Sequence, residues 1–96
     1  MNIVSSHIIV SGVVQGVNFR AFTKYCADEL GLSGTVENRP DGSVEINIVG
    51  ESETIDKLIA RLKKGNGYSR IDNIAIESKP GGKPRGEFRI LRGSRW

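Results

Sequence analysis

The pattern of hydrophobic and polar positions divides the chain into strands and helices. Residues 7–13 are rich in β-branched side chains and include a glycine near their end, which predicts a strand. Apolar positions in residues 19–30 recur at helical spacing, and Gly31 ends the run, so this segment predicts a helix. The apolar stripe of that helix consists of Phe19, Phe22, Cys26, Ala27 and Leu30. We expect the first three of these side chains to pack in the core.

The middle of the chain predicts a hairpin followed by a second helix. Strands at residues 33–38 and 43–49 flank a tight turn, in which a proline fixes one φ angle and a glycine permits a positive one. Residues 51–64 then form a second amphipathic helix, for which Ser52 is the expected N-cap. The apolar stripe of this helix consists of Ile55, Leu58, Ile59 and Leu62.

The last quarter of the chain predicts two further strands. Residues 71–78 alternate regularly, which places Ile71 and Ile74 on opposite faces, and residues 87–91 form a short closing strand after a flexible loop. The resulting order, βαββαβ with a short extra C-terminal strand, predicts a single α+β domain over residues 1–96. This order is the ferredoxin-like plan, an antiparallel sheet with both helices on one face and the first strand in the middle.

Charge is distributed unevenly along the chain. Residues 1–78 carry 8 Lys or Arg and 10 Asp or Glu, whereas residues 79–96 carry 6 Lys or Arg against Glu87 alone. A basic terminal segment attracts anions, either nucleic acids or phosphorylated metabolites. RNA recognition on this fold uses exposed aromatic residues on the central strands, and residues 7–13 and 43–49 contain none. The sequence therefore disfavours nucleic acid as a partner.

Cys26 and His7 are the single cysteine and the single histidine of the chain. One cysteine excludes an intrachain disulfide and a cysteine-based zinc site, and a histidine at the start of a strand is typical of a structural residue. We therefore expect no metal and no other cofactor. No apolar run is long enough to cross a membrane, which indicates a cytoplasmic protein without a membrane partner. The short chain with alternating strands is compatible with a monomer.

Residues 12–20 connect the first strand to the first helix and contain the candidate binding site. Gly12 and Gly16 permit the loop to curl so that successive backbone N–H groups converge, while the helix N-terminus adds a partial positive charge. Arg20, in the first helical turn, can hold the same anion through its guanidinium group. This arrangement favours a phosphate-sized ligand, although an arginine hydrogen-bonded to loop carbonyls would give the same pattern.

Asn38 lies at the end of a predicted strand, directly before the tight turn. On spacing alone, this position is typical of a turn-forming asparagine. A side-chain amide does not ionise, so in a catalytic role Asn38 could orient a water molecule but could not act as a general base. The residues alone leave both interpretations open.

Two segments of the chain resemble the two signatures of the acylphosphatase family. In residues 12–20 the matching positions are Gly12, Val14, Gln15, Gly16, Val17, Phe19 and Arg20. Residues 34–44, followed by Gly50, resemble the second signature, and the similarity extends over nearly the whole chain. The resemblance implies a hydrolase that cleaves acyl phosphates to a carboxylate and inorganic phosphate, without a metal or a covalent intermediate.

The resemblance also implies a role for each site residue. The phosphoryl group would be bound by Arg20 and by the backbone of Gln15, Gly16, Val17, Asn18 and Phe19, and the attacking water would be held by Asn38. Asn18 stands where the family often has glycine, Thr35 where it has an aromatic residue, and Glu37 where it has a basic or neutral one. Regular alternation predicts that Thr35 and Glu37 face away from Asn38. An alternative function on the same fold is a phosphate-binding domain with little or no catalysis.

Overall fold

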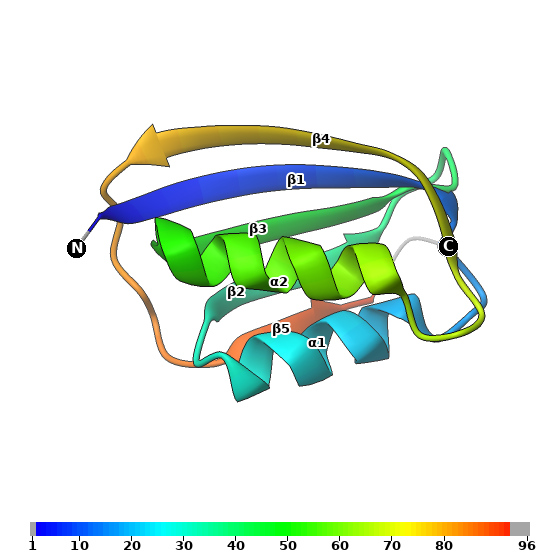
Figure 1. The fold of residues 1–96 in the computed structure, drawn as a ribbon, viewed down its shortest axis with the longest axis horizontal. Helices are drawn as coiled ribbons and strands as arrows, with labels where there is room; N and C mark the ends of the chain where they lie inside the picture. The colour runs from blue at the N-terminus through cyan, green and yellow to red at the C-terminus, as the bar shows by residue number, and fades with distance from the viewer. Residues whose placement is uncertain (1, 93–96) are drawn as a thin grey trace.

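The computed structural model describes residues 2–92 and places two helices on one face of a five-stranded sheet (Figure 1). The strands are β1 (Ile3–Val13), β2 (Ser33–Asn38), β3 (Val44–Glu51), β4 (Arg70–Pro80) and β5 (Phe88–Leu91). The helices are α1 (Phe19–Glu29) and α2 (Ser52–Lys64). In this part of the chain, neither helix is long and apolar enough to cross a membrane. The predicted element order and α+β class are confirmed.

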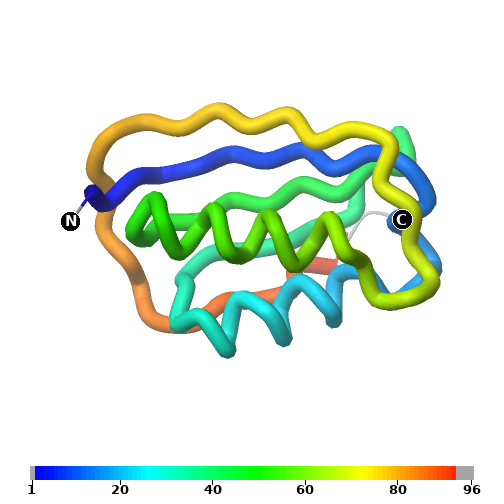
Figure 2. Tube along the Cα trace, viewed as in Figure 1, coloured from blue at the N-terminus to red at the C-terminus, as the bar shows by residue number. Residues whose placement is uncertain are grey.

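The strands follow the order β4-β1-β3-β2-β5 across the sheet, so β1 lies in the interior, as predicted. β1 pairs antiparallel with β3 and β4, and β2 pairs antiparallel with β3. β5 instead runs parallel to β2, which makes the sheet mixed rather than purely antiparallel. The chain leaves β4 and enters β5 at the same end of the sheet, near the N-terminus (Figure 2), and this connection sets the parallel direction.

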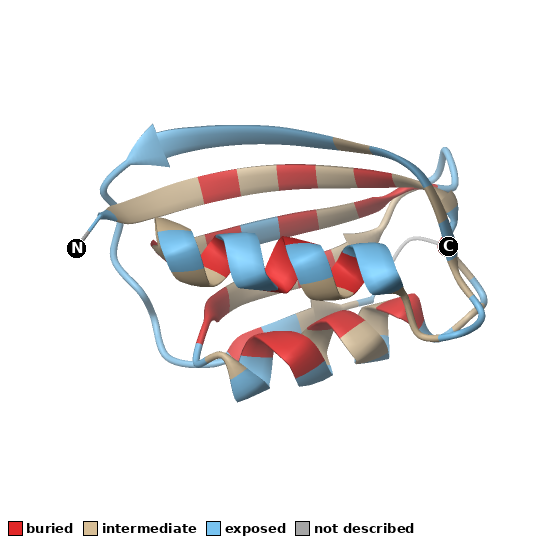
Figure 3. Cartoon of the chain, in the orientation of Figure 1, coloured by how far each residue is buried: buried red, intermediate tan, exposed pale blue. Residues whose placement is uncertain are grey.

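The core lies between the sheet and the two helices, where alternate residues of β1 and β3 face the inner stripes of α1 and α2 (Figure 3). Burial of one large apolar side chain contributes about 1.5–3 kcal/mol relative to exposure. Phe19 and Cys26 are buried and Phe22 packs against them, as predicted. Phe19 and Val14 are each 1% exposed, so the loop between β1 and α1 is anchored in the core at both ends.

A β-bulge in β4 changes the face that Ile71 occupies. The register of β4 against β1 shifts at Gly12, so that Asp72 has no partner on β1. Ile71 and Ile74 therefore both pack against the core, so the prediction that they lie on opposite faces is wrong, whereas residues 73–78 keep a regular register against β1. A Cβ atom at Gly12 would lie 2.1 Å from the carbonyl oxygen of Arg70, so only glycine fits at this position.

Two element starts also differ from the sequence prediction. β1 begins at Ile3 rather than at residue 7, because both of its neighbours continue the ladder to that end. The N-cap of α2 is Glu51, whose backbone is extended, while Ser52 lies within the helix and donates its backbone N–H to Asn2. The expected capping by Ser52 is therefore wrong by one position. Arg95, part of the basic C-terminal segment, lies outside the described residues.

Candidate active site

A pocket of about 560 Å³ opens beside the start of α1, where the loop at residues 14–18 meets the ends of β2 and β5. It contains both Arg20 and Asn38, the two side chains that the sequence singled out. Among residues 2–92, the pocket is lined by Val14, Gly16, Val17, Asn18, Phe19, Arg20, Ala21, Asn38, Tyr68, Ile90 and Arg92. Two of these residues are arginines and none carries a carboxylate, so the local field favours an anionic ligand.

The loop enters α1 through a left-handed residue. Asn18 has φ 64° and ψ 23°, and it is the single non-glycine residue with a positive φ angle within residues 2–92. Asparagine is one of the few residues other than glycine that adopt this conformation readily, which accounts for its presence where the family often has glycine. The carbonyl of Asn18 accepts a hydrogen bond from the N–H of Phe22 at 3.0 Å and closes the first helical turn.

The N-terminus of α1 has neither a side-chain cap nor an acidic residue in its first turn. Asn18, the N-cap residue, makes no side-chain capping hydrogen bond. The first backbone N–H groups of a helix have no partner within the helix, and the macrodipole places a partial positive charge there. The backbone N–H groups of the first turn are therefore not occupied by the side chain of the N-cap residue, and they can donate to an anion in the pocket.

Arg20 is half-buried, and its side chain makes one hydrogen bond within the described part of the chain. Its Nη1 atom donates to the carbonyl oxygen of Leu91, at the end of β5, over 3.2 Å. The sequence left open that Arg20 only forms hydrogen bonds to backbone carbonyls, and the structure contains one such bond. The guanidinium carries five N–H donors, so the others stay available to a ligand while the Leu91 contact orients the group.

Asn38 is the last residue of β2, and its side chain is not used in the turn that follows. Its Oδ1 atom is buried and accepts no hydrogen bond from any residue between 2 and 92. A half-turn of the amide exchanges its oxygen and nitrogen, so either atom can face the pocket. The turn is organised by Asp41 instead, whose Oδ1 accepts bonds from the backbone N–H (2.9 Å) and the hydroxyl (2.6 Å) of Ser43. These bonds hold the pKa of Asp41 below its usual range.

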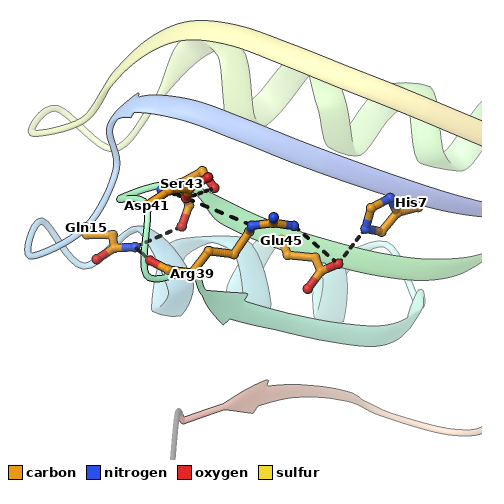
Figure 4. A network of polar contacts seen from close by, with 6 residues as sticks. All are labelled: His7, Gln15, Arg39, Asp41, Ser43 and Glu45. Carbon is orange, nitrogen blue, oxygen red and sulfur yellow. Dashed lines mark hydrogen bonds and ion pairs between the residues drawn. The ribbon is translucent and has the colours of Figure 1, made fainter. Parts of the chain in front are cut away.

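Gln15 is not among the described residues that line the pocket, and its side chain reaches the turn that follows β2 (Figure 4). Its Nε2 atom donates to the carbonyl oxygens of Arg39 at 2.7 Å and Ser43 at 2.8 Å. The side chain therefore ties the loop at residues 14–18 to the turn that follows Asn38. The residues that line the pocket from this loop are 14 and 16–20, so the predicted role of the Gln15 backbone as a phosphate ligand stays a prediction.

His7 lies away from the pocket, on the sheet face opposite the helices. Its Nε2 atom contacts Glu45 Oε2 at 2.5 Å, and Arg39 Nη1 lies 3.8 Å from the same carboxylate oxygen (Figure 4). A pocket of about 810 Å³ on this face is lined by both acidic and basic side chains. Thr35 also lines this pocket. Thr35 thus faces away from Asn38, as the alternation predicted. Because this larger pocket contains neither Arg20 nor Asn38, the smaller one is the candidate active site.

Four further residues line or support the site and were not predicted individually from the sequence. Tyr68, from the loop after α2, is 77% exposed at the rim of the pocket. Ile90 and Arg92 belong to β5 and the residues just beyond it. Asn66 donates from Nδ2 to the carbonyl oxygen of Val17 at 2.8 Å. The basic composition of the C-terminal segment was a signal for Arg92, but no pattern along the chain pointed to Asn66.

The fold and the pocket together define a class of protein: a small ferredoxin-like domain with a pocket at the start of its first helix that two arginines line. The sequence matches the family model described as acylphosphatase over residues 6–90. The chain belongs to the acylphosphatase family.

Similar proteins cover most of the chain. An acylphosphatase of Rhizorhabdus wittichii is 47% identical over 78 residues, which cover 81% of this chain and 79% of the relative. An acylphosphatase of Bifidobacterium longum is 42% identical over 79 residues, which cover 82% and 81% of the two chains. The crystal structure of acylphosphatase from Bacillus subtilis has a TM-score of 0.87 at 34% identity, and the match covers 92% of this chain and 98% of that one.

Proposed function

We propose that this protein hydrolyses acyl phosphates to a carboxylate and inorganic phosphate, and that the reaction takes place in the pocket that contains Arg20 and Asn38. One observation carries the proposal. In a chain of this family, an arginine and a side-chain amide with a buried, unpartnered oxygen line a single pocket at an uncapped helix N-terminus. These are the groups that phosphoryl transfer needs for binding an anion and for orienting water.

The phosphoryl group is bound by the guanidinium of Arg20 and by backbone N–H groups of the loop that enters α1. The helix dipole adds positive potential at the same point. As the bond to the leaving group lengthens, negative charge spreads over the equatorial oxygens, and these fixed donors stabilise it without having to reorganise. The hydrogen bond from Arg20 to Leu91 holds the guanidinium at the pocket wall while its other donors face the ligand.

The attacking water is held by the side-chain amide of Asn38. The oxygen of the water forms a bond to phosphorus while the bond between phosphorus and the carboxyl oxygen breaks, and the electron pair of that bond leaves with the carboxylate. A carboxylate is a weak base, so its departure needs no general acid. The described residues that line the pocket include no Asp, Glu or His, so the proton of the water passes to a phosphoryl oxygen.

We further propose that the enzyme is monomeric and cytoplasmic and needs no metal or other cofactor. Inorganic phosphate is both its product and a competitive inhibitor. Cys26 is buried in the structure and forms no disulfide. Sedimentation of the purified chain tests the monomer, and activity in the presence of EDTA tests the independence from metal.

Hydrolysis of benzoyl phosphate by the wild-type protein and by Arg20→Ala tests the function. We expect wild-type turnover that resists EDTA and is inhibited competitively by phosphate, and a rate about 10²–10³-fold lower for Arg20→Ala. Arg89→Ala is the matched control, because Arg89 is an exposed arginine that lines the pocket on the opposite sheet face. A folded protein that binds phosphate but has no turnover would instead indicate a binding domain, and equal rates for Arg20→Ala and Arg89→Ala would remove Arg20 from the mechanism.

A further inference from the structure

The loop between α2 and β4 contains a side-chain amide that makes three hydrogen bonds. Asn66 Nδ2 donates to the carbonyl oxygen of Val17 at 2.8 Å, and Asn66 Oδ1 accepts from the backbone N–H groups of Tyr68 and Ser69, both at 3.0 Å. A backbone N–H can only donate, so the amide oxygen must face Tyr68 and Ser69. The amide nitrogen must then face Val17, and the network fixes the orientation of the side chain.

The bond to Val17 also fixes the peptide that follows it. This peptide is trans, so the Val17 carbonyl and the Asn18 N–H point in opposite directions from one plane. When Asn66 holds the carbonyl, it directs the Asn18 N–H away from itself. Val17 and Asn18 line the candidate active site, whereas Asn66 is not among the described residues that line it. Asn66 therefore lies behind the loop and the pocket lies in front of it.

Although asparagine adopts the left-handed conformation more readily than most residues, the hydrogen bond from Asn66 adds support to it at Asn18. Its φ angle of 64° lies in the left-handed region, which an L-residue other than glycine occupies at an energetic cost. A flip of the peptide between Val17 and Asn18 would relieve that conformation and would turn the Asn18 N–H out of the pocket. The hydrogen bond from Asn66 opposes the flip, because the flip would break it and turn the Val17 carbonyl away from the amide.

We propose that Asn66 is a positioning residue for the candidate active site: its amide holds the Val17–Asn18 peptide so that the Asn18 N–H faces the bound phosphoryl group. The identity of the ligand rests on the proposed function, whereas the hydrogen bonds that carry the inference do not. Asn66 touches no reacting atom and acts through the backbone of another segment.

Two substitutions separate this role from a general effect on the fold. Asn66→Ala removes all three hydrogen bonds. Asn66→Asp keeps an oxygen for the N–H groups of Tyr68 and Ser69, and replaces the donor to Val17 with a second acceptor. Because aspartate adds a negative charge, Asn73→Asp is the matched control, since Asn73 is exposed and lies on β4 outside the pocket lining. Asn18→Gly, added to Asn66→Asp, is the rescue, because glycine adopts positive φ without the steric cost.

Binding of inorganic phosphate by calorimetry and the amide NMR signal of residue 18 are the readouts. We expect Asn66→Ala and Asn66→Asp each to weaken phosphate binding by about three- to tenfold, the range of one intramolecular hydrogen bond. The phosphate-induced shift of the residue 18 amide should be lost in both variants. Asn73→Asp should bind as the wild type does, and Asn18→Gly should restore part of the affinity in the Asn66→Asp background, which a merely structural role of Asn66 would not allow.

The outcomes distinguish this inference from the proposed function. Wild-type affinity in the folded Asn66→Asp variant, with the residue 18 shift intact, would overturn the role of Asn66 and leave the proposed function standing. A wild-type protein that binds phosphate without a shift at residue 18 would also overturn the role of Asn66 alone, whereas a wild-type protein that neither binds phosphate nor hydrolyses benzoyl phosphate would overturn both. Should Asn66→Ala fail to fold, Asn66→Asp still decides the question, because it retains the acceptor that the loop after α2 requires.

Discussion

Replacing Asn38 with leucine should make the protein more stable while removing its activity. The Oδ1 atom of Asn38 is buried and has no hydrogen-bond partner in the described residues. An unpaired buried acceptor of this kind costs about 1–3 kcal/mol of folding free energy. Leucine has a similar size and no polar atom, so the substitution removes that cost. For a domain of this length, each 1 kcal/mol corresponds to roughly 4–8 °C in Tm.

The loss of activity has a separate cause. In the proposed mechanism, removal of the amide leaves none of the described pocket residues to hold the attacking water in line with phosphorus, and loss of such positioning lowers the rate by about 10²-fold or more. Phosphate affinity should change little, because Arg20 and the loop N–H groups are still present. The two effects together describe a residue that is retained for chemistry at the expense of stability.

Thermal unfolding, phosphate calorimetry and benzoyl phosphate hydrolysis on the same preparation test this prediction. Asn47→Leu is the control, since Asn47 is an exposed asparagine on the neighbouring strand β3 and should gain no stability from the change. A lower Tm for Asn38→Leu would refute the reasoning about the unpaired acceptor. Wild-type turnover in that variant would refute the catalytic role.

Three further predictions concern the supports of the site. Gln15→Ala should lower kcat and reduce stability by about 1–3 kcal/mol in urea unfolding, because two carbonyl acceptors of the β2–β3 turn lose their donor, whereas equal kcat would contradict the coupling of loop and turn. Gly12→Ala should lower Tm sharply, because the new Cβ atom would lie 2.1 Å from the carbonyl oxygen of Arg70. An unchanged melting curve would show that β1 and β4 can move apart there without loss of stability, and would contradict this prediction. Asp41, whose pKa is lowered by the hydrogen bonds from Ser43, stabilises the fold above its unfolded pKa, and this stabilisation is lost as the pH falls through the lower folded value. Stability of Asp41→Asn measured against pH should therefore show a weaker decline in acid than the wild type, and identical acid profiles would contradict this assignment.

Features that depend on residues close together along the chain could be predicted from the sequence alone. The stripe of α1, the strand alternation of β1 and β3 and the order of elements follow from hydrophobic spacing, and the structure confirms them. The resemblance to the acylphosphatase family is also confirmed, and with it the ferredoxin-like fold and the enzyme class. Arg20 and Asn38 lie in one pocket because the crossover through α1 brings the start of that helix beside the end of β2.

Features set by contacts between distant segments were beyond the sequence. The bulge at Asp72 depends on how β4 meets Gly12, so the alternation of residues 71–78 alone placed Ile71 and Ile74 on opposite faces. Arg92 reaches the pocket because β5 pairs parallel with β2, a register that the connecting loop decides. The role of Asn66 could not be predicted, because its bond to Val17 spans 49 positions of the chain.

The central claim is that water attacks the phosphorus of an acyl phosphate held by Arg20. Hydrolysis of benzoyl phosphate in water enriched in the heavy oxygen isotope, followed by mass spectrometry of both products, tests it most directly. The account predicts that the label appears in inorganic phosphate, and that Arg20→Ala releases labelled phosphate about 10²–10³-fold more slowly. Label in benzoate would place the attack at the carbonyl carbon, and wild-type release by Arg20→Ala would place the reaction outside this pocket; either result would contradict the account.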